Sequence, residues 1–325
     1  MKAVKVSEPG PAENLQILDV DIPVPKEGEV LLKVHYFGLN RADISQRYGK
    51  YPPPAGATDI LGLEAVGEIV EDGQCSGQYY LTILVGGGYA QYVTVPREHL
   101  VPIPKGFELQ NAAAIPEVWM TAFQLLTKVA SLKPGDNVLI HAGASGVGTA
   151  AVQIVKDYGA NPYVVVGTQD KIDYCKGLGA LEGFNYKEDG EYYKKFLELT
   201  GGKGADIILD PVGASNFLKN AEMIALDGTW VLFGGLGGTV LENFDLKLLM
   251  RRRVRFLSST LRARPIAYKT ELARDFHAYA IPKFEDGVFK PIIDTVYNFD
   301  QIVEAHKKLE SNTTIGKVLI KVDHQ

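Results

Sequence analysis

The pattern of hydrophobic and polar positions changes about 110 residues into the chain. Up to Leu109, short apolar or alternating runs are separated by Gly and Pro, as in Pro23-Val24-Pro25 and Gly86-Gly87-Gly88. Such runs predict strands without helices between them, which form a twisted sheet or a partial barrel rather than βαβ units. The clearest strands are predicted at 15–20, 29–37, 67–70 and 90–95.

After Lys133 strand-length apolar runs alternate with helical ones, which predicts a doubly wound, Rossmann-type parallel sheet. The segment 111–126, helix-like on both sides of Pro116, carries the chain into this second domain. The C-terminal part, 265–325, returns to mixed helices and strands. Strands are predicted at 138–141, 163–166, 183–185, 207–210, 230–233 and 256–259, and helices at 148–158, 170–178, 192–200, 216–225 and 245–251.

Residues 138–149, V-L-I-H-A-G-A-S-G-V-G-T, join a predicted strand, a glycine turn and a helix start. This layout binds a dinucleotide pyrophosphate, because glycines admit phosphates close to the backbone and a helix N-terminus attracts their charge. Ser145 takes the place of the middle glycine of G-x-G-x-x-G, so this motif by itself is weak evidence for a dinucleotide site. The strand before it and the helix after it favour a dinucleotide site.

The end of the second strand of this domain bears on the choice of nicotinamide cofactor. NAD-binding folds place an acidic residue there, facing the ribose hydroxyls. Here the strand ends in Gly167-Thr168-Gln169 without an acid, Asp170 follows one residue late, and Lys171 is beside it. A cation and hydroxyls suit a 2′-phosphate, which favours NADP(H). Alternatively, Lys171 only lies in the first turn of a helix.

Length and composition limit the remaining classes. A chain of 325 residues predicts two domains, and a formal net charge of −5 argues against nucleic acid or an anionic membrane as the main partner. Two cysteines indicate a reducing compartment and cannot form a four-cysteine zinc site. The six histidines show no metal-ligand spacing, and we expect His141 to be packed or locally hydrogen-bonded. No run reaches the roughly 18 apolar residues of a membrane span. We expect a cytoplasmic protein.

Two segments of the first domain resemble the medium-chain dehydrogenase/reductase superfamily. They are V-H-Y-F-G-L-N-R-A-D-I-S-Q-R-Y-G-K-Y at 34–51 and I-L-G-L-E-A-V-G at 60–67. Zinc-dependent members carry a cysteine near the position of Asn40 and G-H-E where this chain has Gly62-Leu63-Glu64. Both metal ligands are missing, so the resemblance implies the zinc-independent branch and no metal site.

Longer motifs resemble the zeta-crystallin-like NADPH:quinone oxidoreductases along nearly the whole chain. The resemblance implies a GroES-like, mainly β, partly open barrel domain at 1–118, completed by 263–325, and an NADP-binding Rossmann domain at 119–262. It also implies a homodimer, because the last strand of the cofactor domain often pairs across a dimer axis. The segment 74–86 departs from the family pattern and is shortened. The motifs are A-A-A-I-P-E-V-W-M-T-A-F-Q-L-L, H-A-G-A-S-G-V-G-T-A-A-V-Q, G-F-N-Y-K and A-L-D-G-T-W-V-L-F-G.

The resemblance also implies the site residues. The family pattern has a further basic residue near Asn312, which this chain lacks. Tyr51 would close the cleft over cofactor and substrate. The implied cofactor contacts are Ser145, Gly146, Val147, Gly148 and Thr149 for the pyrophosphate, Lys171 and Tyr186 for the 2′-phosphate, Phe233, Gly234 and Gly235 for the nicotinamide, and Thr121 and Asn40 near its ring. Asn312 is also an implied cofactor residue, at the position where the missing basic residue would strengthen the grip on the 2′-phosphate.

The implied reaction is NADPH-dependent reduction of a quinone or another electrophilic acceptor without a metal. Positioning of the reacting atoms would supply much of the acceleration. Tyr51 and Asn40 would donate hydrogen bonds to a developing quinone oxyanion. Alternatively, Tyr51 is a rim residue and Asn40 caps a helix. We expect Arg41 and Asp43 to form a local structural pair.

Two other functions stay open at this point. One is reduction of the C=C bond of an enone or alkenal with the same cofactor. The other is a non-enzymatic NADPH-binding protein, crystallin-like or RNA-binding. Only a basic cluster favours RNA contact, and a solvated face or a subunit interface explains this cluster better. It comprises Arg251, Arg252, Arg253, Arg255, Arg262 and Arg264.

Overall fold

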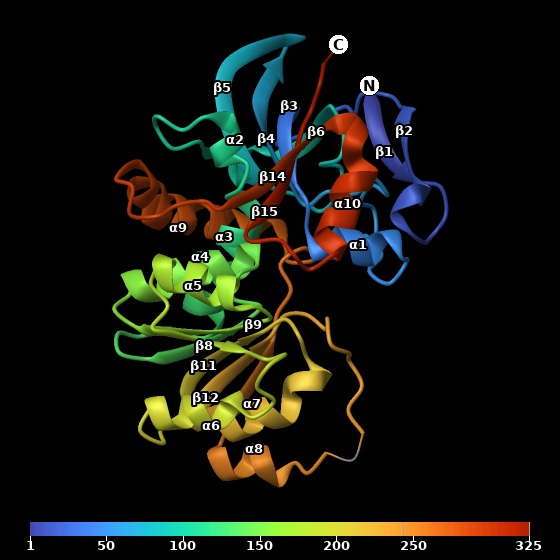
Figure 1. The fold of residues 1–325 in the computed structure, drawn as a ribbon. Helices are drawn as coiled ribbons and strands as arrows, with labels where there is room; N and C mark the ends of the chain where they lie inside the picture. The colour runs from blue at the N-terminus through green and yellow to red at the C-terminus, as the bar shows by residue number, and fades with distance from the viewer. Residues whose placement is uncertain (243, 325) are drawn as a thin grey trace. The chain divides into compact units, whose positions relative to one another are not determined.

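The computed structural model describes residues 1–242 and 244–324 and divides the chain into two compact units (Figure 1). Unit 2 is the continuous segment Thr121–Thr260. Unit 1 combines Met1–Met120 with the segment that starts at Leu261. Gln325, the last residue of the expected segment 263–325, lies outside the described residues.

Unit 2 contains one six-stranded sheet in which every pairing is parallel. The strand order β10-β9-β8-β11-β12-β13 confirms the predicted doubly wound fold. β13 is an edge strand, and its pairing across a dimer axis stays a prediction. The strands are β8 (Asn137–His141), β9 (Asn161–Val166), β10 (Glu182–Asn185), β11 (Ala205–Asp210), β12 (Ile224–Leu232) and β13 (Arg255–Ser258).

Helices cover both faces of this sheet, α4 and α5 on one face and α6 and α7 on the other (Figure 1). Trp230 packs against Phe217 with ring centroids 4.4 Å apart, so aromatic residues fill the layer between the sheet and its helices. The helix predicted to run to Ala225 ends at Met223, because Ile224 already pairs with β11. The helices are α4 (Gly146–Asp157), α5 (Gln169–Leu178), α6 (Tyr192–Leu199), α7 (Phe217–Met223) and α8 (Lys247–Arg252).

Unit 1 is built on a seven-stranded sheet with the order β14-β15-β3-β4-β5-β7, in which β6 also pairs with β3. β1 and β2 form a separate antiparallel pair. The C-terminal strand β15 pairs antiparallel with β3, so both segments that make up unit 1 contribute strands to one sheet. The strands are β1 (Lys2–Val6), β2 (Leu15–Asp19), β3 (Glu29–Gly38), β4 (Glu64–Glu71), β5 (Gln74–Ile83), β6 (Tyr92–Pro96), β7 (Val101–Pro102), β14 (Ile293–Asn298) and β15 (Lys317–Lys321).

The segment 74–86, which departs from the family pattern, contains the ten-residue strand β5. It follows β4 through a turn at Asp72 and Gly73, both with positive φ, and pairs with β4 antiparallel. Polar, exposed residues fill its first half, and the hydrophobic pattern therefore did not mark it. The shortened segment keeps its place in the sheet.

The helices of unit 1 pack on this sheet around a core in which Phe37 stacks on Tyr89 at 4.5 Å. Helix α3 begins in unit 1 at Pro116 and continues into a π-helix at Gln124–Val129. Among the described helices, none is long and apolar enough to cross a membrane. The helices are α1 (Arg41–Arg47), α2 (Leu109–Ala112), α3 (Pro116–Phe123), α9 (Ile266–Glu285) and α10 (Ile302–Glu310).

Candidate functional site

The glycine turn after β8 has the geometry of a phosphate-binding helix start. Ala142 adopts a positive φ of 52°, and the Ser145 hydroxyl caps α4 by accepting from the Gly148 N–H at 3.1 Å. A Cβ at Gly148 would lie 2.5 Å from the backbone oxygens of Ala142 and Gly143, so only glycine fits. The half-exposed residues 145–147 stand at the helix N-terminus, where backbone N–H groups and the dipole favour an anion. These residues fit a pyrophosphate.

Thr149 does not offer its hydroxyl at this turn. The residue is buried, and its Oγ1 donates to the backbone oxygen of Gly146 at 3.1 Å. Its side chain therefore stabilises the first turn of α4 rather than pointing outward.

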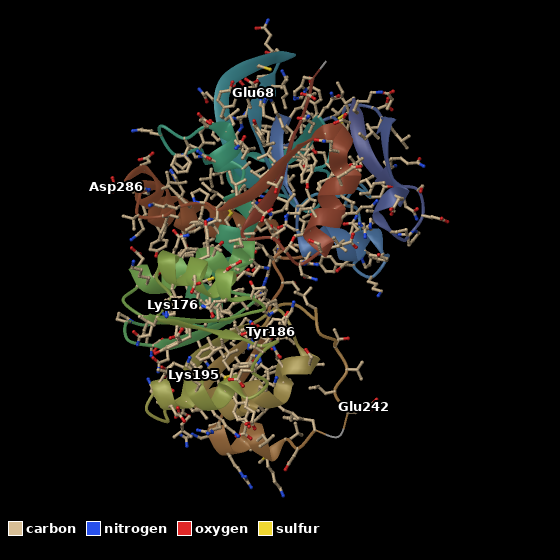
Figure 2. The ribbon with its side chains drawn as sticks, in the orientation of Figure 1. Glu68, Lys176, Tyr186, Lys195, Glu242 and Asp286 are labelled. Atoms are coloured by element: carbon tan, nitrogen blue, oxygen red, sulfur yellow. The ribbon has the colours of Figure 1, made fainter. Side chains whose placement is uncertain are left out.

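A second corner of unit 2 gathers Tyr186 and Lys187 over Gly167, directly after β9. A Cβ at Gly167 would lie 3.2 Å from both the Tyr186 hydroxyl and the Lys187 Cε. The Tyr186 side chain is half exposed (Figure 2), and its backbone N–H donates to Val166 at 3.1 Å. Lys171 lies in the first turn of α5, which Thr168 precedes. Sequence reasoning gave Lys187 no role, although it ends the motif G-F-N-Y-K.

A buried carboxylate organises the carboxyl ends of the central strands. Asp210, the last residue of β11, is fully buried. Its Oδ1 accepts from the N–H groups of Val212 and Gly213 at 2.7 and 2.9 Å. Its Oδ2 accepts from the Asn220 amide and the Trp230 indole, both at 3.0 Å. Four donors thus fix the turn that follows β11.

The segment predicted to line the nicotinamide lies against this turn. The Phe233 N–H donates to the backbone oxygen of Asp210 at 2.9 Å, and the Leu236 N–H donates to the backbone oxygen of Pro211 at 3.0 Å. A Cβ at Gly234 would lie 2.7 Å from the Pro211 oxygen, so glycine permits the close approach. Gly234 and Gly235 are exposed. Because β8, β11 and β12 are parallel neighbours, this segment and the glycine turn share one edge of the sheet.

His141 has the packed role that the sequence predicted. It is buried at the end of β8, and its Nε2 lies 2.6 Å from the Asn220 Oδ1. Its Nδ1 lies 3.2 Å from the Asn216 amide nitrogen. The imidazole therefore links β8 to the helix that also contacts Asp210.

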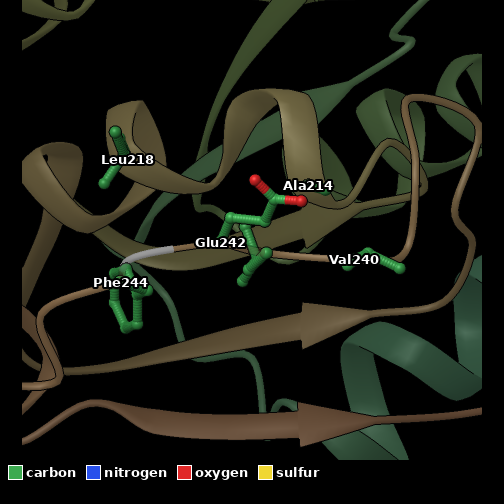
Figure 3. Close-up of a pocket in the computed structure, with 6 residues that line it drawn as sticks. Ala214, Leu218, Val240, Glu242 and Phe244 are labelled. Carbon is green, nitrogen blue, oxygen red and sulfur yellow. The ribbon is translucent and has the colours of Figure 1, made fainter.

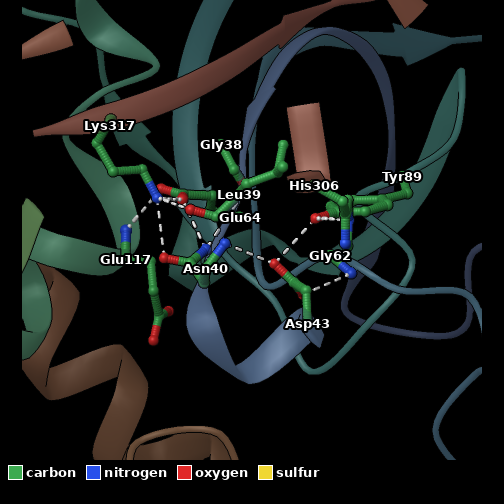
Figure 4. Close-up of polar contacts among 10 residues, drawn as sticks. All are labelled: Gly38, Leu39, Asn40, Asp43, Gly62, Glu64, Tyr89, Glu117, His306 and Lys317. Carbon is green, nitrogen blue, oxygen red and sulfur yellow. Dashed lines mark hydrogen bonds and ion pairs between the residues drawn. The ribbon is translucent and has the colours of Figure 1, made fainter. Parts of the chain in front are cut away.

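In unit 1, the side chain of Asn40 is bound within the protein. Figure 4 shows Asn40, Glu64 and Lys317 pointing toward one another. The Asn40 Nδ2 donates to the Glu64 Oε1 at 2.8 Å and makes a long contact of 3.4 Å to the Gly38 oxygen. Its Oδ1 accepts from the Lys317 ammonium at 2.8 Å. Asn40 precedes α1 as its N-cap residue, which supports the capping interpretation.

Lys317 and Glu64 form a buried ion pair at this position. The Nζ of Lys317 lies 2.5 Å from the Glu64 Oε1 and also donates to the Leu39 oxygen at 2.8 Å. The Glu64 Oε2 accepts from the Glu117 N–H at 2.9 Å. An ammonium group beside Asn40 is incompatible with a second cation there. The side chain of Leu63 cannot bind a metal, and the described residues contain no metal-binding group of His, Cys, Asp or Glu. These residues do not fit a catalytic zinc.

Asp43 is a further buried acid, and the expected pair with Arg41 is wrong. Its carboxylate accepts from the Asn40 N–H at 2.8 Å, the Tyr89 hydroxyl at 3.1 Å and the Gly62 N–H at 3.2 Å. Burial raises the pKa of Asp43 to about 6. The Arg41 Nη2 instead donates to the Asn312 Oδ1 at 2.5 Å. Apart from Asn40, these alternative partners come from distant segments, which a local pairing rule misses.

A buried histidine continues the chain of hydrogen bonds from Asp43 and Tyr89. The His306 Nε2 lies 3.1 Å from the Tyr89 hydroxyl, and its Nδ1 lies 3.0 Å from the Arg47 Nη1. Arg47 also forms a two-point ion pair with Glu310, at 2.6 and 3.2 Å. Burial, aided by the positive charge of Arg47, lowers the pKa of His306 to about 3. The histidine is therefore neutral in the folded protein.

Tyr51 is half-buried, and burial raises the pKa of its hydroxyl, which therefore stays protonated at neutral pH. The Arg262 guanidinium lies against its ring at 5.2 Å. The expectation that Arg262 belongs to a solvated basic face is wrong, because the residue is only 5% exposed. Arg253 forms an exposed ion pair with Asp227.

Each unit thus collects part of the predicted site. Unit 2 places the glycine turn and the segment 233–235 at one sheet edge, with Tyr186 directly after β10. Unit 1 contains Asn40, Tyr51 and Asn312, of which Asn40 is enclosed in hydrogen bonds. Thr121 lies on α3, where unit 2 begins.

A shallow pocket of about 410 Å³ on unit 2 contains none of the predicted site residues (Figure 3). Its walls are mostly apolar. Its lining residues are Ala214, Leu218, Val240, Leu241, Glu242 and Phe244.

The chain is similar to known proteins over its full length. Residues 26–105 match the model of the alcohol dehydrogenase GroES-like domain, and residues 146–277 match that of the zinc-binding dehydrogenases. A quinone oxidoreductase of Lama guanicoe is 31% identical over 330 residues, which cover 98% of this chain and 97% of the relative. One of Homo sapiens is 29% identical over 328 residues, with the same coverage. The solved Escherichia coli quinone oxidoreductase, complexed with NADPH, has a TM-score of 0.88 at 26% identity and covers 99% of this chain and 100% of its own.

Proposed function

Because the chain belongs to the quinone oxidoreductase family, within the zinc-independent medium-chain dehydrogenases/reductases, we propose that it reduces quinones with a hydride from NADPH. Oxidoreduction with NADPH is the general activity, and a quinone is the proposed acceptor. The observation that carries the cofactor choice is the corner at Gly167. There a hydroxyl and an ammonium group stand at the end of β9, without the acid that would favour NAD.

The residues of unit 2 fit a bound dinucleotide. The backbone N–H groups of the glycine turn would hold the pyrophosphate, while Tyr186, Lys187 and Lys171 would hold the 2′-phosphate. Gly234 and Gly235 would let the nicotinamide approach the backbone. Bound NADPH would supply the hydride and its two electrons.

The protein's own contribution is positioning. The Asp210 carboxylate fixes the turn beside 233–235, so this edge of the site is organised before a ligand arrives. Asn40 would hold Glu64 and Lys317 rather than touch the acceptor, since its amide hydrogens are already engaged.

The test is NADPH oxidation, followed by the absorbance of the reduced nicotinamide, with an ortho-quinone, a para-quinone and an enone. We expect turnover with a quinone and NADPH, and little with NADH. Turnover with the enone alone would assign the protein to the alkene reductases. NADPH binding without reduction of any acceptor would favour a non-enzymatic role.

The cofactor assignment has its own test in Lys187→Ala and Lys171→Ala. Each should raise the Kd for NADPH at least about tenfold, because a charge-assisted hydrogen bond to phosphate contributes about 1.5–3 kcal/mol. The Kd for NADH should not change. Lys176→Ala is the matched control, since Lys176 is also a lysine of α5 but pairs with Glu182. Equal losses of affinity for NADPH and for NADH would refute a 2′-phosphate site.

A further inference from the structure

The buried carboxylate of unit 2 carries a charge that its own partners do not balance. Asp210 is fully buried, and its two oxygens face only N–H donors, which are two backbone groups, the Asn220 amide and the Trp230 indole. A protonated carboxyl would turn a hydrogen toward one of these donors, so the group is ionised. All four partners are neutral, and the described residues contain no ion pair of Asp210 with a cation.

The histidine at the end of this hydrogen-bond network does not supply a balancing charge. The Nδ1 of His141 lies 3.2 Å from the Asn216 amide nitrogen and accepts from it, and its Nε2 donates to the Asn220 Oδ1 at 2.6 Å. Burial lowers the pKa of His141, in spite of the charge of Asp210. The imidazole is therefore neutral, and the network keeps the full negative charge of the carboxylate.

This charge acts on groups beyond its hydrogen-bonded partners. Burial, followed by the charge of Asp210, raises the pKa of the Tyr192 hydroxyl on α6. Lys219 acts on the same region, but its ammonium lies 5.3 Å from the centroid of the Tyr192 ring and makes no ion pair with Asp210 in the described part of the chain. Charges in a protein interior are screened far less than charges in water. The field of Asp210 therefore extends across the carboxyl ends of the neighbouring strands.

Asp210 ends the strand that lies between the two segments assigned to the cofactor. On one side of β11, β8 leads into the glycine turn, and on the other side β12 leads into 233–235. Neighbouring strands lie about 4.8 Å apart, so Asp210 is one strand away from each segment. The Phe233 N–H also donates to the backbone oxygen of Asp210 at 2.9 Å. A cofactor that joins the two segments therefore passes close to this charge.

The proposed reaction changes the charge of the cofactor at this edge. The neutral dihydronicotinamide ring loses a hydride, one proton with two electrons, and is left with one positive charge. The quinone takes the hydride, becomes the monoanion of the hydroquinone and then accepts a proton from water. A fixed negative charge nearby stabilises the cationic ring and leaves the neutral ring nearly unaffected.

Resting on the proposed function and on the nicotinamide site at 233–235, we propose that Asp210 sets the redox balance of the bound cofactor. Its buried charge stabilises NADP⁺ relative to NADPH, so bound NADPH becomes a stronger hydride donor. Asp210 is a positioning residue rather than a catalytic one, because its oxygens are fully engaged by the four donors and act on the ring only through their field.

The test is the Kd for NADP⁺ and the Kd for NADPH in the wild type and in Asp210→Asn, measured by calorimetric titration without an acceptor. A unit charge within about 12 Å changes the affinity for a cation roughly tenfold at an effective dielectric constant of about 20. We expect the wild type to bind NADP⁺ more tightly than NADPH, and D210N to lose roughly a factor of ten of this preference. Such a loss equals a shift of about 30 mV in the two-electron potential of the bound cofactor. Equal changes in the two Kd values would overturn the proposal.

Two further variants separate the charge from the hydrogen bonds. Trp230→Phe removes one hydrogen bond to the carboxylate and keeps the charge, so the preference for NADP⁺ should change less than about twofold. The double variant Asp210→Asn with Asn220→Asp moves the charge within the same network and should restore the preference. If W230F loses as much of it as D210N, or the double variant restores nothing, the role of Asp210 is only structural.

The shape of the site has its own probe in adenosine 2′,5′-bisphosphate, which lacks the nicotinamide. Its Kd should agree within about twofold between the wild type and D210N, because the charge acts on the nicotinamide ring. A loss of affinity as large as the loss for NADP⁺ would show that the turn after β11 is distorted and would refute an electrostatic role.

The two proposals fail in distinguishable ways. If the wild type binds both forms of the cofactor but reduces no quinone, the proposed function fails, and the ratio of the two Kd values still tests Asp210. If the wild type reduces quinones while D210N keeps the ratio of the wild type, the role of Asp210 is refuted and the function stands. Should D210N not fold, tighter binding of NADPH than of NADP⁺ by the wild type would overturn the assignment.

Discussion

At the scale of single residues, the neighbours of His306 decide which of its nitrogens carries the proton. Arg47 can only donate, so the Nδ1 of His306 must accept and its Nε2 must bear the hydrogen that points to Tyr89. We predict this tautomer alone between about pH 5 and 8. The ¹⁵N chemical shifts of the ring test it, and a protonated Nδ1 would contradict it.

The same residues give a pH dependence of stability. The pKa of His306 falls from 6.5 to about 3 on folding, so below pH 6.5 the unfolded chain binds a proton that the folded protein does not. The free energy of unfolding therefore falls by about 1.4 kcal/mol for each unit by which the pH is lowered below 6.5. The pKa of Asp43 rises from 3.8 to about 6, so here the folded protein binds the proton first. The two effects on the free energy of unfolding oppose each other between about pH 6 and 4. Below about pH 4, the loss of stability caused by His306 dominates.

A matched pair of variants separates these effects. His306→Gln keeps an acceptor for Arg47 and a donor for Tyr89 but cannot titrate. Compared with the wild type, it should lose less stability as the pH falls from about 6.5 to 3, while Asp43→Asn should lose more between about 6 and 4. Urea unfolding at about pH 7, 5 and 4 measures both. If the free energy of unfolding depended on pH in the same way in all three proteins, neither residue would contribute to the pH dependence of stability.

At the scale of elements, the glycine turn makes a prediction about cofactor binding. Gly148→Ala forces a Cβ against two backbone oxygens, so the turn must shift and the Kd for NADPH should rise at least about tenfold. Gly177→Ala is the control, because nothing beyond its chain neighbours and the backbone of α5 itself lies within 4 Å of its Cβ position. That change should leave the Kd unchanged and add up to about 1 kcal/mol of stability. Calorimetric titration with NADPH distinguishes the two.

Periodicity predicted the parallel sheet because its buried strands are continuous apolar runs. It did not mark β5, whose exposed first half carries no hydrophobic signal. For the candidate site, local motifs indicated the glycine turn and Tyr186. They could not indicate that Lys317 meets Asn40, or that His306 meets Arg47, since those contacts join residues more than 250 positions apart. A run of arginines in the sequence likewise did not show that Arg262 is buried.

At the scale of the whole molecule, the pair between Glu64 and Lys317 fastens the last strand to the first part of unit 1. Lys317→Met would leave the buried Glu64 charge uncompensated and should cost about 3–5 kcal/mol. The double variant Glu64→Gln with Lys317→Met should be more stable than the single variant K317M. Guanidinium unfolding of the wild type, the two single variants and the double variant gives the coupling free energy between Glu64 and Lys317. Strictly additive losses of stability would disprove this coupling.

The pairing of β15 with β3 also sets an order of events while the chain is being made. Unit 2 is continuous and can complete its sheet soon after its own residues leave the ribosome. β6 covers the first half of β3, but the end of β3 at 36–38 must wait for 317–321, about 200 residues after residue 120, before its edge is covered. At about 5–20 residues per second, this takes roughly 10–40 s. Throughout that interval the nascent chain exposes an open strand edge, and we expect it to be a client of chaperones that bind extended segments.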